Sequence, residues 1–106
     1  MERFCFIIKV KPELLDEYLS AHEKIWPEML QAMHDAGIRN YSMFSREDGV
    51  LIGYLEADDV QKALTKSAES DVSHRWQKEM ARFFEPVADG MAPGMYQILK
   101  EYFYTN

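Results

Sequence analysis

The sequence predicts an α+β fold with the element order βαββαβ, and three observations support this prediction. Four segments are rich in the β-branched and aromatic residues that favour strands. The segments between them carry apolar residues at helical spacing. With 106 residues, of which 47% are hydrophobic and 28% charged, the chain is long enough for a single domain, residues 1–106, and too short for two.

The first predicted strand covers residues 3–10, with the sequence RFCFIIKV. Because side chains alternate along a strand, its apolar residues divide between the two faces of the sheet. One face carries Phe4, Phe6, Ile8 and Val10, and the other carries Cys5 and Ile7.

A helix interrupted by a proline is predicted next. The first position of a helix suits proline, so Pro12 begins a helix that is expected to extend through His22. Pro27 disfavours helical geometry in the residue before it. It therefore predicts a break and a second helix, 27–36, which Gly37 is placed to end.

A β-hairpin and two further helices follow. Residues 38–45 and 50–57 are predicted strands, and the turn between them contains Gly49, which can adopt a positive φ. Helices are then expected over 59–68 and 72–84, the second preceded by a Ser-Asp cap.

The chain ends with a predicted loop over 85–95 and a last strand over 96–104. The complete order of elements is that of a ferredoxin-like sandwich, in which helices cover one face of a four-stranded sheet. The strand at 50–57 is nevertheless apolar on both faces. Because the helices leave one face open, we expect a homodimer joined through its sheets.

Composition argues against several classes of partner. The formal net charge of −6 leaves no basic excess to neutralise a nucleic-acid backbone. No apolar run reaches the ~20 residues of a membrane-spanning helix. The single cysteine, Cys5, allows no internal disulfide, and the N-terminus lacks the pattern of a signal peptide. We expect a cytoplasmic protein that binds neither nucleic acid nor membrane.

Four residues from three predicted elements form a candidate site. Tyr18 and His22 are neighbours on one helix face. Tyr41 lies in the middle of a strand, on the same face as Arg39, and Trp76 lies in the second helical layer. If the two helices pack side by side on the sheet, these side chains line one gap between helices and sheet.

The chemistry of this set favours a small neutral polyol. Histidine gives and takes protons near neutral pH. Tyrosine hydroxyls form hydrogen bonds, and the face of a tryptophan offers a flat apolar surface to the C–H face of a sugar.

Each of these residues also has a purely structural explanation. Histidine and tryptophan on a helix stripe are commonly core or boundary residues, and tyrosine is common at interfaces. The sequence contains no histidine pair at metal-ligand spacing, no Gly-rich phosphate loop and no nucleophile elbow. The residues alone therefore predict a dimeric α+β domain with a small pocket and no metal.

The chain carries four segments at the spacing of a known family: YLSAHEKIWPE (18–28), RNYS (39–42), SDVSHRWQKEM (70–80) and EYFY (101–104). Together they resemble the L-rhamnose mutarotase family over essentially the whole chain. The resemblance implies ferredoxin-like protomers that pair as a dimeric α/β barrel. It also implies a cofactor-free cytoplasmic isomerase that interconverts the α and β anomers of L-rhamnose.

Carried across by motif, the resemblance makes His22 the proton donor and makes Tyr18, Tyr41 and Trp76 the sugar-binding residues. The family can carry a second aromatic residue directly after the tryptophan, where this chain has Gln77. An amide can hydrogen-bond a hydroxyl but offers no stacking surface. Gln77 is therefore expected to bind substrate, and the preferred deoxy sugar stays open.

The expected reaction opens the hemiacetal ring to the aldehyde and closes it on the other carbonyl face. In this hypothesis His22 protonates the ring oxygen and takes the proton back on closure, while Tyr18 or water handles the other proton. Two other functions fit the same fold class. One is a heme-degrading monooxygenase with His22 as iron ligand, and the other is a non-catalytic, ligand-binding dimer whose aromatic residues are all core.

Overall fold

The computed structural model describes all 106 residues, and its order of elements confirms the predicted ferredoxin-like fold. The strands are β1 (Glu2–Lys9), β2 (Arg39–Ser45), β3 (Val50–Ala57) and β4 (Gln97–Leu99). The helices are α1 (Leu15–Glu23), α2 (Pro27–Asp35), α3 (Val60–Ala68) and α4 (Asp71–Met80). Short 3₁₀ turns precede α1 and follow α4, at Pro12–Leu14 and Ala81–Phe83.

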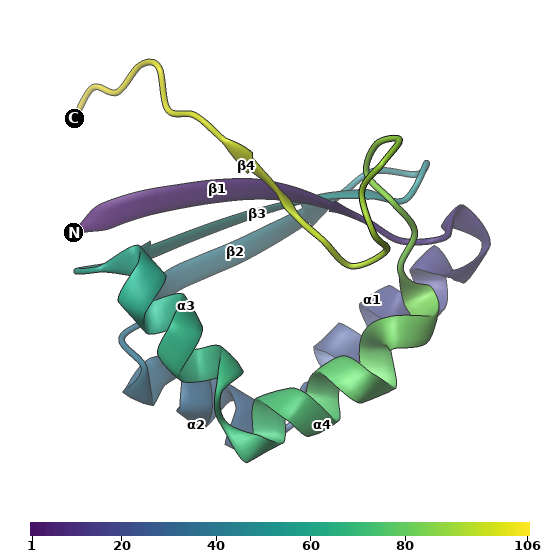
Figure 1. The fold of residues 1–106 in the computed structure, drawn as a ribbon, viewed down its shortest axis with the longest axis horizontal. Helices are drawn as coiled ribbons and strands as arrows, with labels where there is room; N and C mark the ends of the chain where they lie inside the picture. The colour runs from purple at the N-terminus through teal and green to yellow at the C-terminus, as the bar shows by residue number, and fades with distance from the viewer.

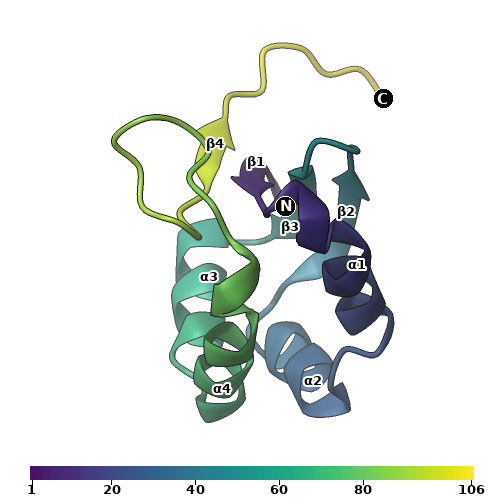
Figure 2. The ribbon, with the colours of Figure 1, turned by 90° about the vertical axis from the view of Figure 1, so that its right-hand side faces the viewer.

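The strands form one antiparallel sheet in the order β2-β3-β1-β4. All four helices lie on one side of this sheet, and the opposite side carries no helix (Figures 1 and 2). In Figure 2, α1 and α2 form one row and α3 and α4 form the other. None of the helices has the length and hydropathy that a membrane crossing requires.

Local sequence explains where the chain breaks and turns. Trp26 has extended geometry (φ −61°, ψ 132°), and Pro27 takes the first position of α2, as predicted. Gly37 follows α2 with a φ of +100°, and Gly49 closes the hairpin with a φ of +89°. A Cβ at Gly49 would overlap the carbonyl oxygen of Val10, so this turn accepts only glycine.

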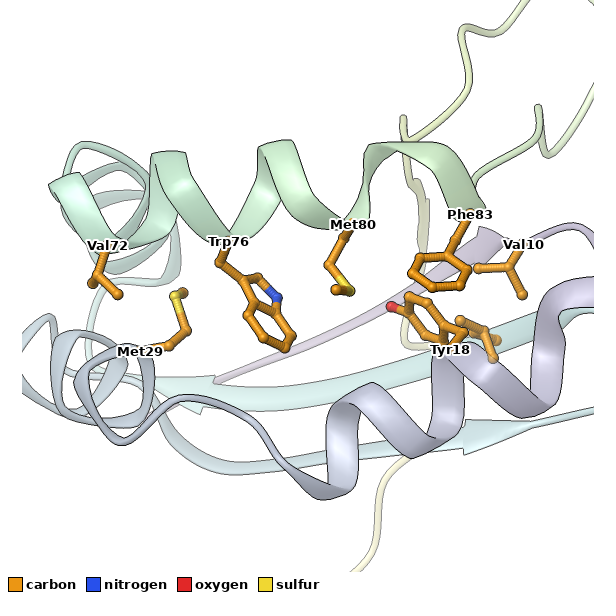
Figure 3. Close-up of a cluster of buried hydrophobic side chains, with 8 residues drawn as sticks. Val10, Tyr18, Met29, Val72, Trp76, Met80 and Phe83 are labelled. Carbon is orange, nitrogen blue, oxygen red and sulfur yellow. The ribbon is translucent and has the colours of Figure 1, made fainter.

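The core consists of two clusters between the helices and the sheet. The larger, shown in Figure 3, contains Val10, Tyr18, Met29, Leu51, Val72, Trp76, Met80 and Phe83. The smaller contains Phe6, Ile38, Leu55, Ala57, Val60 and Ala63. Burying each large apolar side chain contributes roughly 1.5–3 kcal/mol. The larger cluster therefore holds α1, α2 and α4 against the sheet, and the smaller holds α3.

The two faces of the sheet differ as the alternation of side chains predicted. Leu51 and Leu55 are buried beneath the helices, with 2% and 1% of their surface exposed. On the outer face, Phe44 and Ile52 are 65% and 39% exposed. Ile52 pairs with Ile7 of β1 and with Phe44 of β2, so apolar side chains adjoin one another across this open face.

The last strand is shorter than predicted. The pattern of the sequence indicated a strand over 96–104, but β4 contains only Gln97–Leu99, and residues 100–106 extend beyond it as exposed chain. Alternating aromatic residues favour a strand, yet a strand also requires a partner for its backbone groups. β4 finds that partner only along Cys5–Ile7 of β1. The tail then leaves the sheet on the side away from the helices (Figures 1 and 2).

Candidate active site

A cavity of about 800 Å³ lies between the helices and the sheet, and hydrophobic residues make up 20 of the 26 that line it. A volume of this size is typical of small-molecule sites. The lining includes all five residues predicted for the site: Tyr18, His22, Tyr41, Trp76 and Gln77. The fold therefore brings together residues of α1, β2 and α4 that are far apart in the sequence.

Tyr18 and His22 lie one turn apart in α1, with their ring centroids 4.4 Å from one another. The Tyr18 ring also packs edge-on against Phe83 at 5.4 Å, which holds it in place. Nδ1 of His22 lies 3.2 Å from the carbonyl oxygen of Tyr18. Because a carbonyl oxygen can only accept, this bond assigns the hydrogen to Nδ1 and leaves Nε2 as a free proton acceptor.

Trp76 approaches His22 from α4. Their ring centroids are 5.4 Å apart in an edge-to-face arrangement, and Trp26 packs edge-on to Trp76 at 5.1 Å. In Figure 3 the Tyr18 hydroxyl points toward the side of Trp76, and the end of the Met80 side chain lies between the two. Trp26 lies in the break between α1 and α2, directly before Pro27. It does not line the cavity and instead packs against Trp76.

Tyr41 enters the cavity from β2, where its ring meets the edge of Phe6 at 6.4 Å. The sequence predicted that Arg39 shares a face of the sheet with Tyr41, and this prediction is wrong. β2 shifts register between Arg39 and Ser42, which places Arg39 on the opposite face. Gln77 lies at the exposed margin of the cavity and donates from Nε2 to Oγ of Ser73 at 3.1 Å. The carbonyl oxygen of the Gln77 amide stays available to a ligand.

Several polar atoms of the site have no hydrogen-bond partner within the protein: the hydroxyls of Tyr18 and Tyr41 and the indole N–H of Trp76. Every fully buried side-chain nitrogen or oxygen in the chain does have a partner. The Tyr18 hydroxyl and the Trp76 indole N–H are therefore accessible to solvent, and Tyr41 is itself an exposed residue. Because all three residues line the cavity, a bound polyol can take the place of that solvent.

Burial controls the protonation of the same side chains. It raises the pKa of Tyr18 far above its ordinary value and the pKa of Tyr41 to about 12, so both phenols keep their protons at neutral pH. Burial also lowers the pKa of His22, and the bond to the Tyr18 carbonyl oxygen opposes that lowering only in part. At neutral pH, His22 is a neutral imidazole among neutral neighbours, an environment suited to an uncharged ligand.

The candidate site predicted from the sequence did not include Ser73, Met80 or Tyr96, which also line the cavity. Helical spacing places Met80 on one stripe with Trp76, and Ser73 stands three residues before Trp76, so both could have been added to the site from the sequence. Tyr96 comes from the loop before β4, and no local pattern indicates where such a loop returns to the sheet.

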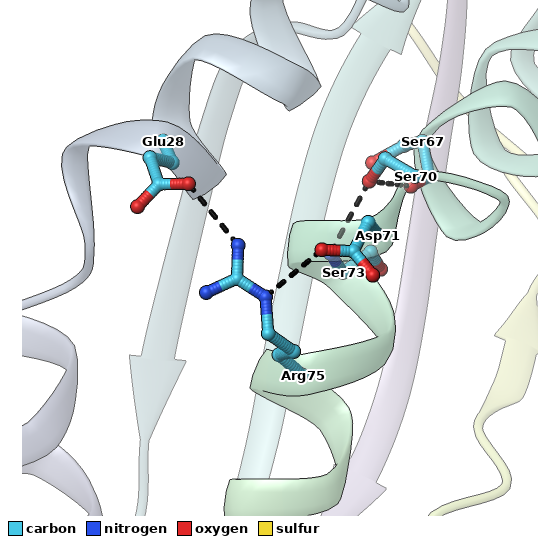
Figure 4. A network of polar contacts seen from close by, with 6 residues as sticks. All are labelled: Glu28, Ser67, Ser70, Asp71, Ser73 and Arg75. Atoms are coloured by element: carbon cyan, nitrogen blue, oxygen red, sulfur yellow. Dashed lines mark hydrogen bonds and ion pairs between the residues drawn. The ribbon is translucent and has the colours of Figure 1, made fainter.

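An exposed network of ion pairs joins α2 and α4 (Figure 4). Trp76 belongs to α4, and Trp26 directly precedes α2. Arg75 of α4 bonds to Asp71 and to Glu28 of α2, both at 3.1 Å, and its guanidinium lies 5.8 Å from the Trp26 ring centroid. Glu28 stands in the first turn of α2. Because these side chains are exposed, solvent screens the ion pairs and they contribute little to stability. The network therefore adds only a weak contact between α2 and α4.

Comparison with known proteins gives one consistent result. The family model described as L-rhamnose mutarotase matches residues 3–105. The L-rhamnose mutarotase of Bacillus subtilis is 38% identical over 107 residues, which cover 100% of both chains. The crystal structure of an L-rhamnose mutarotase from Formosa agariphila has a TM-score of 0.81 and 25% identity, again over 100% of both chains.

An antibiotic biosynthesis monooxygenase also superposes, with a TM-score of 0.62 over 96% of this chain and 99% of that one. At 14% identity this likeness extends to the fold alone. The family match and the full-length identity, by contrast, place the chain by its sequence. The chain belongs to the L-rhamnose mutarotase family.

Proposed function

We propose that this protein is an L-rhamnose mutarotase, an isomerase that interconverts the α and β anomers of the sugar, and that His22 carries the proton transfer. The observation that carries the proposal is the neutral imidazole of His22 between Tyr18 and Trp76 in a largely apolar cavity. Family membership supports the substrate and the reaction. It also favours this function over the monooxygenase and the non-catalytic dimer that the same fold allows.

Anomer exchange requires one proton to move between two oxygens that are bonded to the same carbon. As the ring opens, the anomeric hydroxyl loses its proton and becomes the carbonyl, and the ring oxygen gains a proton as its bond to that carbon breaks. Nε2 of His22 takes the first proton, and the resulting imidazolium delivers it to the ring oxygen. Closure on the opposite face of the carbonyl follows the same steps in reverse, and no cofactor is needed.

This order modifies the hypothesis drawn from the sequence, in which His22 donates first. A neutral imidazole with its hydrogen on Nδ1 has no proton to give at Nε2 until it has accepted one. Tyr18 and Tyr41 keep their protons and therefore serve as hydrogen-bond donors to sugar oxygens. Positioned acid–base catalysis is worth about 10²–10⁴-fold, which is enough for a reaction that already proceeds slowly in water.

The lining of the cavity supports a deoxy sugar as substrate. L-rhamnose carries a methyl group where L-mannose carries a hydroxymethyl group, and Met29, Met43 and Met80 all line the cavity. An additional hydroxyl buried against such side chains lacks a hydrogen-bond partner.

We expect saturation-transfer NMR to detect catalysed anomer exchange with L-rhamnose, and kcat/KM for L-mannose to be lower by up to about 100-fold. These two sugars differ by one hydroxyl group, so the comparison tests the apolar lining alone. Equal rates with both would contradict the proposed preference for a deoxy sugar. The absence of catalysed exchange with either sugar would contradict the proposed function itself.

We also infer that the protein is a homodimer joined through the open faces of its two sheets. Phe44, Ile52 and Leu99 are 65%, 39% and 37% exposed on or beside that face. Tyr102 and Phe103 in the tail are 96% and 72% exposed on the same side of the sheet. Monomeric proteins rarely leave so much contiguous apolar surface in water. The cytoplasmic location and the single domain over residues 1–106 stay predictions of the sequence.

Light scattering is expected to give twice the chain mass of 12.4 kDa for the native protein, and the mass of one chain for Ile52→Glu. A charge at the centre of the open face meets the same charge on the partner, because a two-fold interface brings equivalent surfaces together. Leu30→Glu is the matched control, since Leu30 is 50% exposed but lies on α2, across the protomer from that face. A monomeric native protein, or loss of the dimer in the control alone, would rule out this interface.

A further inference from the structure

We propose that Asn40 is a positioning residue for Tyr41, and that it acts by holding a bulge in β2. The inference rests on the proposed function, in which Tyr41 binds the sugar, and goes beyond it to the residue that delivers Tyr41 to the cavity. Asn40 is the only residue other than glycine with a positive φ, at +50°. Asparagine is one of the few residues with a side chain that adopt this left-handed geometry readily.

The bulge changes which side of the sheet each residue of β2 faces. Arg39 pairs with Glu56 of β3, whereas Ser42 pairs with Tyr54. Three steps along β2 therefore correspond to two steps along β3. One extra residue lies between the two pairs, and the alternation of faces reverses across it.

This reversal allows two residues three positions apart to face the helices together. Ile38 is buried in the core with 7% of its surface exposed, and Tyr41 lines the cavity. In a regular strand, residues three apart point to opposite faces. Without the bulge, only one of the two can keep its place. Tyr41, at 39% exposed, has less burial to lose than Ile38, so Tyr41 is the residue expected to leave.

The Asn40 side chain also fastens the bulge to the neighbouring strand. Its Nδ2 donates to Oε1 of Glu56 at 2.5 Å, and the Tyr54 hydroxyl donates to Oε2 of the same carboxylate at 2.6 Å. The bond from Tyr54 lowers the pKa of Glu56 most, and the bond from Asn40 lowers it further. The carboxylate therefore stays ionised, and both bonds are charge-assisted. Tyr54 pairs with Cys5 on the outer face, so this network supports Tyr41 from the side of the sheet opposite the cavity.

Two substitutions separate the backbone geometry from the side chain. Asn40→Ala removes both the preference for a positive φ and the bond to Glu56, whereas Asn40→Gly removes only the bond. We expect Asn40→Ala to raise KM for L-rhamnose by roughly 5- to 30-fold, with a smaller change in kcat. This range of KM corresponds to the free-energy cost of left-handed backbone geometry in an ordinary residue. Asn40→Gly should raise KM by less than Asn40→Ala, because it loses the bond to Glu56 but keeps the left-handed geometry. A native KM in a folded Asn40→Ala variant would overturn the proposal.

The same substitution in a Tyr41→Ala background shows whether Asn40 acts through Tyr41. We expect Asn40→Ala to raise KM no further in that background. An equal rise in both backgrounds would mean that Asn40 affects the site by another route, and the proposal would be wrong. A native KM for Tyr41→Ala alone would instead remove the sugar-binding role of Tyr41 from the proposed function, and the inference with it.

A second variant keeps the test decisive if circular dichroism shows Asn40→Ala to be unfolded. Glu56→Ala removes the acceptor on β3 and leaves the residues of β2 unchanged. It should raise KM in the native background and leave KM unchanged in the Tyr41→Ala background. Equal effects of Glu56→Ala in both backgrounds would overturn the proposal in the same way.

Discussion

His22→Ala is expected to reduce catalysed anomer exchange by about 10²–10⁴-fold without loss of the fold. His22 is the one imidazole lining the cavity, and burial holds the protons of Tyr18 and Tyr41 to much higher pH, so His22 is the side chain suited to exchange a proton near neutral pH. Saturation-transfer NMR on L-rhamnose measures the exchange, and circular dichroism checks the fold. Native exchange in a folded His22→Ala variant would remove His22 from the reaction.

The matched control for this substitution is His34→Ala. His34 is exposed on α2 and does not line the cavity, so its removal should leave both exchange and fold unchanged. A loss of exchange in the control equal to that in His22→Ala would show that the assay responds to histidine removal in general rather than to chemistry in the cavity.

The pH profile of the native enzyme distinguishes the direction of the first proton transfer. Because the pKa of His22 lies below its ordinary value of about 6.5, the neutral acceptor form dominates at neutral pH. kcat/KM should therefore be constant around neutrality and fall only in acid. The folded state also binds this proton more weakly than the unfolded chain, so His22 destabilises the fold progressively as pH falls below about 6.5. A rate that instead falls as pH rises through neutrality would favour protonated His22 as the active form.

Most of the fold follows from patterns that act locally, which is why the sequence predicts it. Pro27 breaks the helix wherever α2 packs, and Gly49 permits the hairpin turn whatever surrounds it. β4 pairs with β1 only along Cys5–Ile7, and alternation within 96–104 contains no information on where that pairing stops. The bulge at Asn40 lets both Ile38 and Tyr41 face the helices. This requirement depends on the positions of β3 and the helices, so it follows only from the folded structure.

The candidate site likewise combines features that local sequence determines with features that depend on the folded structure. Helical spacing places Tyr18 beside His22 from the sequence alone. The approach of Trp76 to His22 requires α4 to pack beside α1, which the sequence allows but does not specify. The protonation of His22 depends on burial and on one backbone carbonyl oxygen, so it follows only from the folded structure. Trp26 stands four residues after His22, as His22 does after Tyr18. The break before Pro27 nevertheless keeps Trp26 out of the cavity lining.

Trp76→Ala is expected to weaken both the fold and the binding of the sugar. The side chain is only 9% exposed, and truncation of a buried tryptophan typically lowers the free energy of unfolding by about 3–5 kcal/mol. The sugar loses an aromatic contact and a hydrogen-bond donor, worth about 0.5–1.5 kcal/mol each. KM for L-rhamnose should therefore rise by about 5- to 100-fold. Urea denaturation measures the first effect, and initial rates of anomer exchange measure the second.

Leu51→Ala separates these two effects, because Leu51 is buried in the same cluster as Trp76 but does not line the cavity. Its loss should lower the free energy of unfolding by about 2–5 kcal/mol and leave KM unchanged. A rise in KM only in Trp76→Ala would mean that the indole contributes directly to the sugar. If both variants raised KM equally, Trp76 would be a core residue whose loss disturbs the cavity without removing a contact to the sugar. The binding free energy would then come from Tyr18, Tyr41 and Gln77.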